Sequence, residues 1–235
     1  MLYTRILIQS NIHSIKTKIT ELKTTVIVDT IKGLESLLTL TFGDKFNEQF
    51  EEYPNWITKI IFGCYFNQPV DNLHPQSCLT CNKYCESCQQ KCISKNLLTE
   101  IIFGQYFNQP VNNLPNQLIN LTFGQNFNQQ VDNLPNQLMN LTFGHDFNQY
   151  VNCLPNTIIN LKFGWCFNQS IDNLPNQITN LEFGIDFNQN INFFLPNLTH
   201  LTHLTFGNNF NQSIDNLPNQ ITNLKFKYNF NFPVD

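Results

Sequence analysis

The feature that most constrains this chain is a 20-residue word, Leu-Thr-Phe-Gly-x-x-Phe-Asn-Gln-x-Val-Asp-Asn-Leu-Pro-Asn-Gln-Leu-x-Asn, which recurs with variations. The intervals between its copies are 20 residues, apart from one of 41 and one of 23. Two columns of the word hold 18 of the 22 Phe, and eight of the nine Gly follow the first Phe. The first Phe of each unit is Phe42, Phe62, Phe103, Phe123, Phe143, Phe163, Phe183, Phe206 or Phe226.

This period predicts a solenoid of short coils. Helix-pair repeats need more than about 30 residues, whereas 20 residues suit one strand and tight turns. In the spacing of Leu138, Leu141 and Phe143, the last two residues alternate as a half-buried strand requires. We expect the Gly that follows to adopt backbone angles that a residue with a Cβ resists. Pro135, which lacks an N–H, belongs in the return path.

The predicted fold is therefore a β-rich, right-handed repeat solenoid, similar to leucine-rich repeats. It has about nine 20-residue coils, one face of parallel strands and little helix. Composition agrees, because the chain contains 37 Asn and no Ala, the best helix former.

The repeat divides the chain into four segments. They are residues 1–33, an N-terminal cap; residues 34–74, units 1 and 2; residues 75–95, a cysteine-rich insertion; and residues 96–235, units 3 to 9. Ile19 and Leu22 can belong to a degraded unit within the cap, and Thr25–Val28 has a strand-like composition. The last unit is incomplete, so we expect its edge to be short and exposed or covered by another chain.

An asparagine follows the second Phe in all nine units. We predict that these residues turn inward and form a ladder, in which each amide pairs backbone groups at the bend and the Asn of the next coil. A buried amide without partners would cost about 1–3 kcal/mol. The alternative is that Asn merely tolerates the turn. The column is Asn47, Asn67, Asn108, Asn128, Asn148, Asn168, Asn188, Asn211 and Asn231.

The word Phe-Asn-Gln-x-Val/Ile, together with Leu-Pro-x-x-Leu-x-x-Leu-x-Phe-Gly, resembles the FNIP repeat of social amoebae and giant viruses. The resemblance covers residues 34–235 apart from the insertion. It implies a solenoid similar to leucine-rich repeats and a role in binding proteins. Some members of the family carry an F-box before the repeats, but residues 1–33 show no such pattern.

Composition narrows the partners and the location. The net charge of −4 does not indicate the basic surface that nucleic-acid-binding proteins use, so we expect no nucleic-acid partner. No run of 18 apolar residues predicts a membrane span. The apolar run Ile6–Ile8 after Arg5 is too short for a signal peptide. We expect a cytoplasmic protein, in the host cytoplasm if it is viral.

The insertion contains a cluster of cysteines with the spacing Cys-x2-Cys-x3-Cys-x2-Cys. Four thiolates suit one structural zinc ion, but the three-residue gap is shorter than structural sites usually have. Free thiols, and disulfides formed on oxidation, remain alternatives. The cluster is thus either a zinc-binding or redox-responsive module or a set of free thiols without a cofactor. Its residues are Cys78, Cys81, Cys85 and Cys88, with His74 and Cys92 as substitute ligands.

Between the Gly and the second Phe of each unit lie two residues that vary freely. Coils stacked at about 4.8 Å would spread these positions over roughly 40 Å. Repeat proteins bind partners through such surfaces, and Tyr and Trp are common anchors. The alternative is that nothing constrains these positions. The candidate partner-binding residues are Tyr65, Tyr106, His145, Trp165 and Ile185.

We predict no enzymatic activity and no small-molecule substrate. His145 and Asp146 are neighbours in sequence, so their side chains should point apart on a strand or turn. The single cysteines Cys64, Cys153 and Cys166 are interpreted as substitutions within repeat columns. The sequence shows neither a phosphate-binding Gly-rich loop nor a nucleophile elbow. The function predicted is a non-enzymatic protein-interaction scaffold whose partner is unknown, and the alternative is the zinc or redox module.

Overall fold

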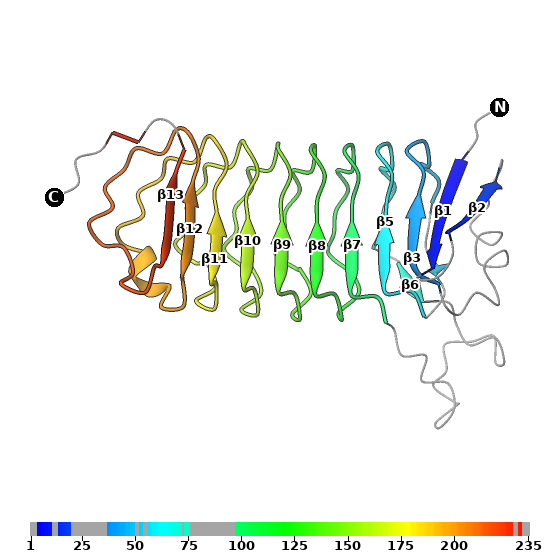
Figure 1. The fold of residues 1–235 in the computed structure, drawn as a ribbon, viewed down its shortest axis with the longest axis horizontal. Helices are drawn as coiled ribbons and strands as arrows, with labels where there is room; N and C mark the ends of the chain where they lie inside the picture. Colours follow the sequence, from blue (N-terminus) through cyan, green and yellow to red (C-terminus); the bar gives the residue numbers. More distant parts are fainter. Residues whose placement is uncertain are drawn as a thin grey trace, which may run out of the picture.

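The computed structural model describes the backbone of residues 4–10 and 14–19, and residues 37–49, 52–53, 56–71, 73–75, 97–227 and 230–231. Within these residues the chain forms one long sheet, whose strands lie side by side in a row (Figure 1). Nine of its strands are parallel, which confirms the predicted fold class. They are β3 (Leu37–Phe42), β5 (Lys59–Ile61), β7 (Glu100–Ile102), β8 (Asn120–Thr122), β9 (Asn140–Thr142), β10 (Asn160–Lys162), β11 (Asn180–Glu182), β12 (His203–Phe206) and β13 (Asn223–Phe226).

The register of the sheet follows the repeat. Asn140 pairs with Asn160, and Asn160 with Asn180, so equivalent residues lie next to each other on neighbouring strands. The two irregular intervals do not disturb this order. Lys59 pairs with Glu100 across the 41-residue interval. The 23-residue interval contains the 3-10 helix η1 (Leu195–Asn197), the only helical element in the described part of the chain.

The ends of the row differ from its middle. β1 (Thr4–Ser10) and β2 (Ser14–Ile19) form an antiparallel hairpin, and β1 pairs with β3. The segment Thr25–Val28, predicted to be strand-like, lies outside the described residues. At the other end β13 is the edge strand, and its Leu224 is 36% exposed, whereas the equivalent Leu141 is 1% exposed.

A short pair, β4 (Glu52–Tyr53) and β6 (His74–Pro75), lies outside the main sheet. No helix among the described residues has the length and apolar character needed to cross a membrane.

The core consists of columns of identical side chains. Within one coil the rings of Phe143 and Phe147 stack, with centroids 3.7 Å apart. Between coils, Phe143 stacks on Phe163 at 5.7 Å and Phe147 on Phe167 at 6.1 Å. Such aromatic pairs add about 0.5–1.5 kcal/mol each beyond the burial of their area. Among the described residues, no polar or charged side chain belongs to the buried core.

The glycine column marks the closest approach of neighbouring coils. A Cβ on Gly144 would lie 1.8 Å from the carbonyl oxygen of Gly124 and 3.0 Å from the Cα of Gln125. Six other repeat glycines show the same conflict with the preceding coil, and none of the seven has a left-handed φ. The sequence-based explanation by backbone angles is therefore wrong. Glycine is required because backbone lies against backbone, which leaves no room for a side chain.

The asparagine column, whose members directly follow the second Phe of each unit, also links neighbouring coils. The Oδ1 of each Asn accepts a hydrogen bond from the backbone N–H of the next Asn in the column, at 2.8–3.0 Å in all eight steps. In seven steps it also accepts from the Nε2 of the Gln that follows that Asn. The side chains are half-buried or exposed, not turned into the core as predicted. The core is filled by Phe, so the amides lie at its rim.

Replacing Gly144 by Ala should lower the free energy of unfolding by about 3 kcal/mol or more, because backbone atoms cannot move aside as a side chain can. The measurement is urea denaturation followed by circular dichroism. Gln130→Ala, which changes an exposed residue of the preceding unit, serves as the control and should change stability by less than about 0.5 kcal/mol. Equal stability of the two variants would show that the coils are not in this contact.

Replacing Asn148 by Ala should cost about 1–3 kcal/mol, because the N–H of Asn168 loses its acceptor and the Nε2 of Gln169 keeps only the backbone oxygen of residue 148. Asn148→Asp keeps an oxygen at the same position and should lose less. Thermal or urea unfolding of the two variants tests this. A loss of equal size in both would mean that the acceptor oxygen is not what Asn148 contributes.

Candidate functional site

Two surfaces of the solenoid carry the residues that vary between coils. The first is the outward face of the sheet. The second, here called the turn ridge, lies along the edge of the sheet where the strands end, at the upper edge in Figure 1. The turn ridge consists of the residue pairs 44–45, 64–65, 105–106, 125–126, 145–146, 165–166, 185–186 and 208–209, each in the turn after the repeat glycine.

The polar side chains of the sheet face pair with one another. Asn140 Nδ2 donates to Asn120 Oδ1, and Asn160 Nδ2 to Asn140 Oδ1, both at 2.5 Å, and Asn180 continues the row by donating to Asn160. Two ion pairs also bridge neighbouring strands, Lys59–Glu100 at 2.8 Å and Lys162–Glu182 at 3.1 Å. A depression over β9–β12 is lined by part of this set, Asn140, Asn160, Asn180, Lys162 and Glu182, together with residues such as Thr142, His203 and Thr205. A partner that bound here would have to replace these contacts.

This second asparagine row was not predicted. Its signal was in the sequence, because Asn recurs one position before the inward Leu of four consecutive units. The Asn that follows the second Phe gives a stronger signal, because it is invariant over nine units. The row on the sheet face exists only where four neighbouring strands carry the same residue.

The backbone fixes the turn ridge in place. At each step, the N–H of the second ridge residue donates to the carbonyl oxygen of the first ridge residue one coil earlier. Examples are Asp146 to Gln125 at 2.8 Å, Cys166 to His145 at 2.9 Å and Asp186 to Trp165 at 2.9 Å. The ridge is thus a hydrogen-bonded extension of the sheet, and its side chains project from a fixed frame.

Four of the predicted partner-binding residues form two aromatic pairs on the turn ridge. Tyr65 and Tyr106 stack with centroids 5.1 Å apart, and they are 52% and 40% exposed. Trp165 is 48% exposed, and its ring lies tilted beside that of His145 at 5.0 Å. Ile185, in the next coil, is half-buried. The structure therefore brings Tyr65 close to Tyr106, and His145 close to Trp165.

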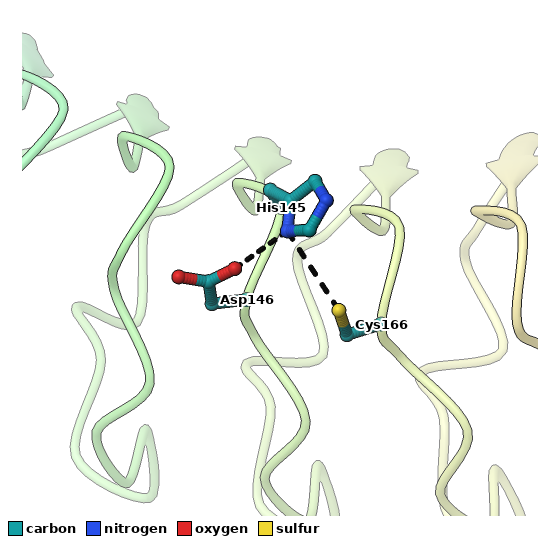
Figure 2. Close-up of side chains that lie close together, drawn as sticks. All are labelled: His145, Asp146 and Cys166. Carbon is teal, nitrogen blue, oxygen red and sulfur yellow. Dashed lines mark hydrogen bonds and ion pairs between the residues drawn. The ribbon is translucent and has the colours of Figure 1, made fainter.

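Figure 2 shows a cluster of three polar side chains, His145, Asp146 and Cys166, on two adjacent coils. The Nδ1 of His145 lies 2.5 Å from Oδ1 of Asp146 and 3.7 Å from Sγ of Cys166. The sequence-based expectation that His145 and Asp146 point apart is wrong. In a tight turn, unlike a strand, two successive side chains can converge on the same side, and stacking then adds the residue of the next coil.

The geometry of this cluster does not match a nucleophilic relay. Such a relay uses one imidazole nitrogen for the nucleophile and the other for the carboxylate. Here Cys166 and Asp146 both approach Nδ1 of His145. Partial burial and the negative charges of Asp186 and Asp146 also raise the pKa of the Cys166 thiol above its usual range. A thiol with a raised pKa is a poorer nucleophile at neutral pH.

The remaining residues are the predicted metal ligands and the single cysteines that were interpreted as substitutions within repeat columns. The cysteine ligands lie outside the described residues and are Cys78, Cys81, Cys85, Cys88 and Cys92. His74 belongs to β6, but its side chain is not described. The single cysteines Cys64 and Cys153 lie within the described residues. Cys64 donates from Sγ to Gln105 at 3.4 Å, and Cys153 is an exposed free thiol.

The comparisons with known proteins agree with this architecture. The family model described as FNIP Repeat matches residues 89–125, 110–146, 127–166, 147–184, 167–209 and 199–229. The chain is also similar to a solved structure, the crystal structure of CroV588, a novel circular LRR protein, with 43% identity and a TM-score of 0.71. That match covers 86% of this chain but 28% of the other chain. The search of curated proteins gave no match. A tandem array matched by the family model over more than half of its length shows that this chain belongs to the FNIP-repeat family.

Proposed function

We propose that this chain is a non-enzymatic protein-interaction scaffold that binds a protein partner through the turn ridge. The observation that carries the proposal is the set of exposed aromatic side chains on a ridge whose backbone is hydrogen-bonded from coil to coil. Rigid aromatic groups lose little conformational entropy on binding and are the commonest interface anchors. Repeat proteins with this architecture use extended surfaces for partners.

The arrangement of the aromatic groups supports a two-point contact. Tyr65 and Tyr106 form one anchor on neighbouring coils. Trp165 forms a second anchor three coils beyond Tyr106, at a distance of about 14 Å if coils are spaced by about 4.8 Å. The intervening Gln125 is smaller and bonds to Gln105 at 3.0 Å. A partner with two apolar recesses at this spacing would match the ridge.

The sheet face is a weaker candidate for the same role. Its Asn row and its ion pairs already join neighbouring coils. Binding there would exchange existing hydrogen bonds for new ones, with a small net gain of about 1 kcal/mol each. The ridge instead offers apolar area that is not yet buried. We also propose a cytoplasmic setting, in which the thiols of Cys64, Cys153 and Cys166 would stay reduced.

The alanine variants of Tyr106 and Trp165 should weaken binding of the scaffold's partner by about 2 kcal/mol each, roughly 30-fold in Kd. Partners are first identified by affinity capture with the wild-type chain, and Kd values are then measured by calorimetry. Tyr150→Ala is the matched control, because Tyr150 is 64% exposed but lies outside the ridge.

The control variant should bind like wild type, and all three variants should unfold at the wild-type temperature. Partners that bind the Trp165 and Tyr106 variants as tightly as wild type would exclude the ridge as their binding surface. Loss of binding in the Tyr150 variant alone would assign the contact to the return side of the coils.

A further inference from the structure

Three different metal-ligating atoms converge on the turn ridge. The Nδ1 of His145, a carboxylate oxygen of Asp146 and the Sγ of Cys166 all lie within 4.8 Å of one another. Among the described residues this is the one group of His, Cys, Asp and Glu so arranged. All three residues are half-buried, and the side chains of His145 and Asp146 are 38% and 42% exposed.

We propose that His145, Asp146 and Cys166 form a binding site for one divalent transition-metal ion, preferably Zn²⁺, on the turn ridge. This site is separate from the cysteine-rich insertion and does not depend on the proposed binding function. It uses three protein ligands, which leaves one tetrahedral position for water or for a ligand atom from a partner.

The distances fit a tetrahedral ion with a small adjustment. Zinc bonds of about 2.0–2.1 Å to nitrogen and about 2.3 Å to sulfur place those two atoms roughly 3.5 Å apart. The corresponding separation of His145 Nδ1 and Cys166 Sγ is 3.7 Å. His145 Nδ1 and Asp146 Oδ1 are closer, at 2.5 Å, because they share a hydrogen bond. Replacing that proton by a metal ion needs the carboxylate to move by about 1 Å.

The chemistry of the donors selects the kind of ion. One imidazole, one thiolate and one carboxylate form a mixed set that suits zinc and its neighbours in the first transition row. Calcium and magnesium prefer sets made entirely of oxygen. The double approach of Asp146 and Cys166 to the same nitrogen, which does not fit a relay, is what a shared metal ion requires.

The charges around the cluster also favour a cation. Asp146 and Asp186 belong to the coils on either side of Cys166, in the same ridge column. A divalent cation bound at the cluster is attracted by these two carboxylates.

The repeat frame holds the ligands ready. The N–H of Cys166 donates to the carbonyl oxygen of His145 at 2.9 Å, so the backbones that carry two of the ligands are fixed relative to each other. The equivalent ridge pair one coil earlier is Gln125 and Asn126, which offers no such set. A metal ion would therefore link two particular coils and lie beside Trp165.

The position of Trp165 provides a local test. The chain contains two tryptophans, so Trp56→Phe leaves Trp165 as the single indole, next to His145. The full-length, reduced Trp56→Phe chain is titrated with Co²⁺, which quenches nearby indole fluorescence, and then with Zn²⁺. We expect saturable quenching by one Co²⁺ per chain and recovery of the fluorescence when Zn²⁺ displaces it. The insertion lies outside the described residues, so the Cys166→Ser variant below separates an ion held by its cysteines from an ion held by the ridge.

Cys166→Ser in the same background should weaken Co²⁺ binding by roughly tenfold or more, because the thiolate ligand is lost. The control is Cys153→Ser, which removes an exposed thiol outside the ridge and should bind Co²⁺ like its parent. Thermal unfolding of both variants checks that the coils remain stacked. Equal quenching in the two variants, or no quenching of Trp165 in the parent chain, would overturn the proposal.

Discussion

The structure depends on the direct stacking of each coil on the one before it. At Gly144 and Gly124 the two backbones lie so close that no Cβ fits between them. This contact fixes the spacing at which the Phe rings stack and the asparagine column bonds. A coil that shifted by one residue would lose all three interactions together, because every column changes its partner at once.

Stacking in register has a consequence for the surface. Where consecutive units carry the same polar residue, each copy bonds to the next, as Asn120, Asn140 and Asn160 do on the sheet face. Such columns have little unused hydrogen-bonding capacity. Distinct chemistry arises where the repeat changes from one coil to the next. The turn ridge is the place where this happens most, and both of our proposals concern it.

The repeat predicted the fold class, the parallel sheet and the family, and each of these is confirmed. The inward Leu and Phe columns followed from a period of 20 with alternation in the strand. Two physical interpretations were less accurate. The glycines were explained by backbone angles, although contact between coils requires them. The asparagines of the column that includes Asn148 were expected inside, but phenylalanine fills that space and the amides lie at its rim.

The candidate site was predicted only in part. Tyr65, Tyr106 and Trp165 were predicted to bind a partner because they are large residues at variable turn positions. The structure shows that their side chains are exposed. The cluster around His145 was missed, because Cys166 is a whole repeat unit away in sequence and looked like an isolated substitution. By itself, then, the sequence determined which residues form the columns, since a fixed period allows one register. Only the tertiary structure decided which side chains of adjacent coils meet, because that depends on the direction each leaves its turn.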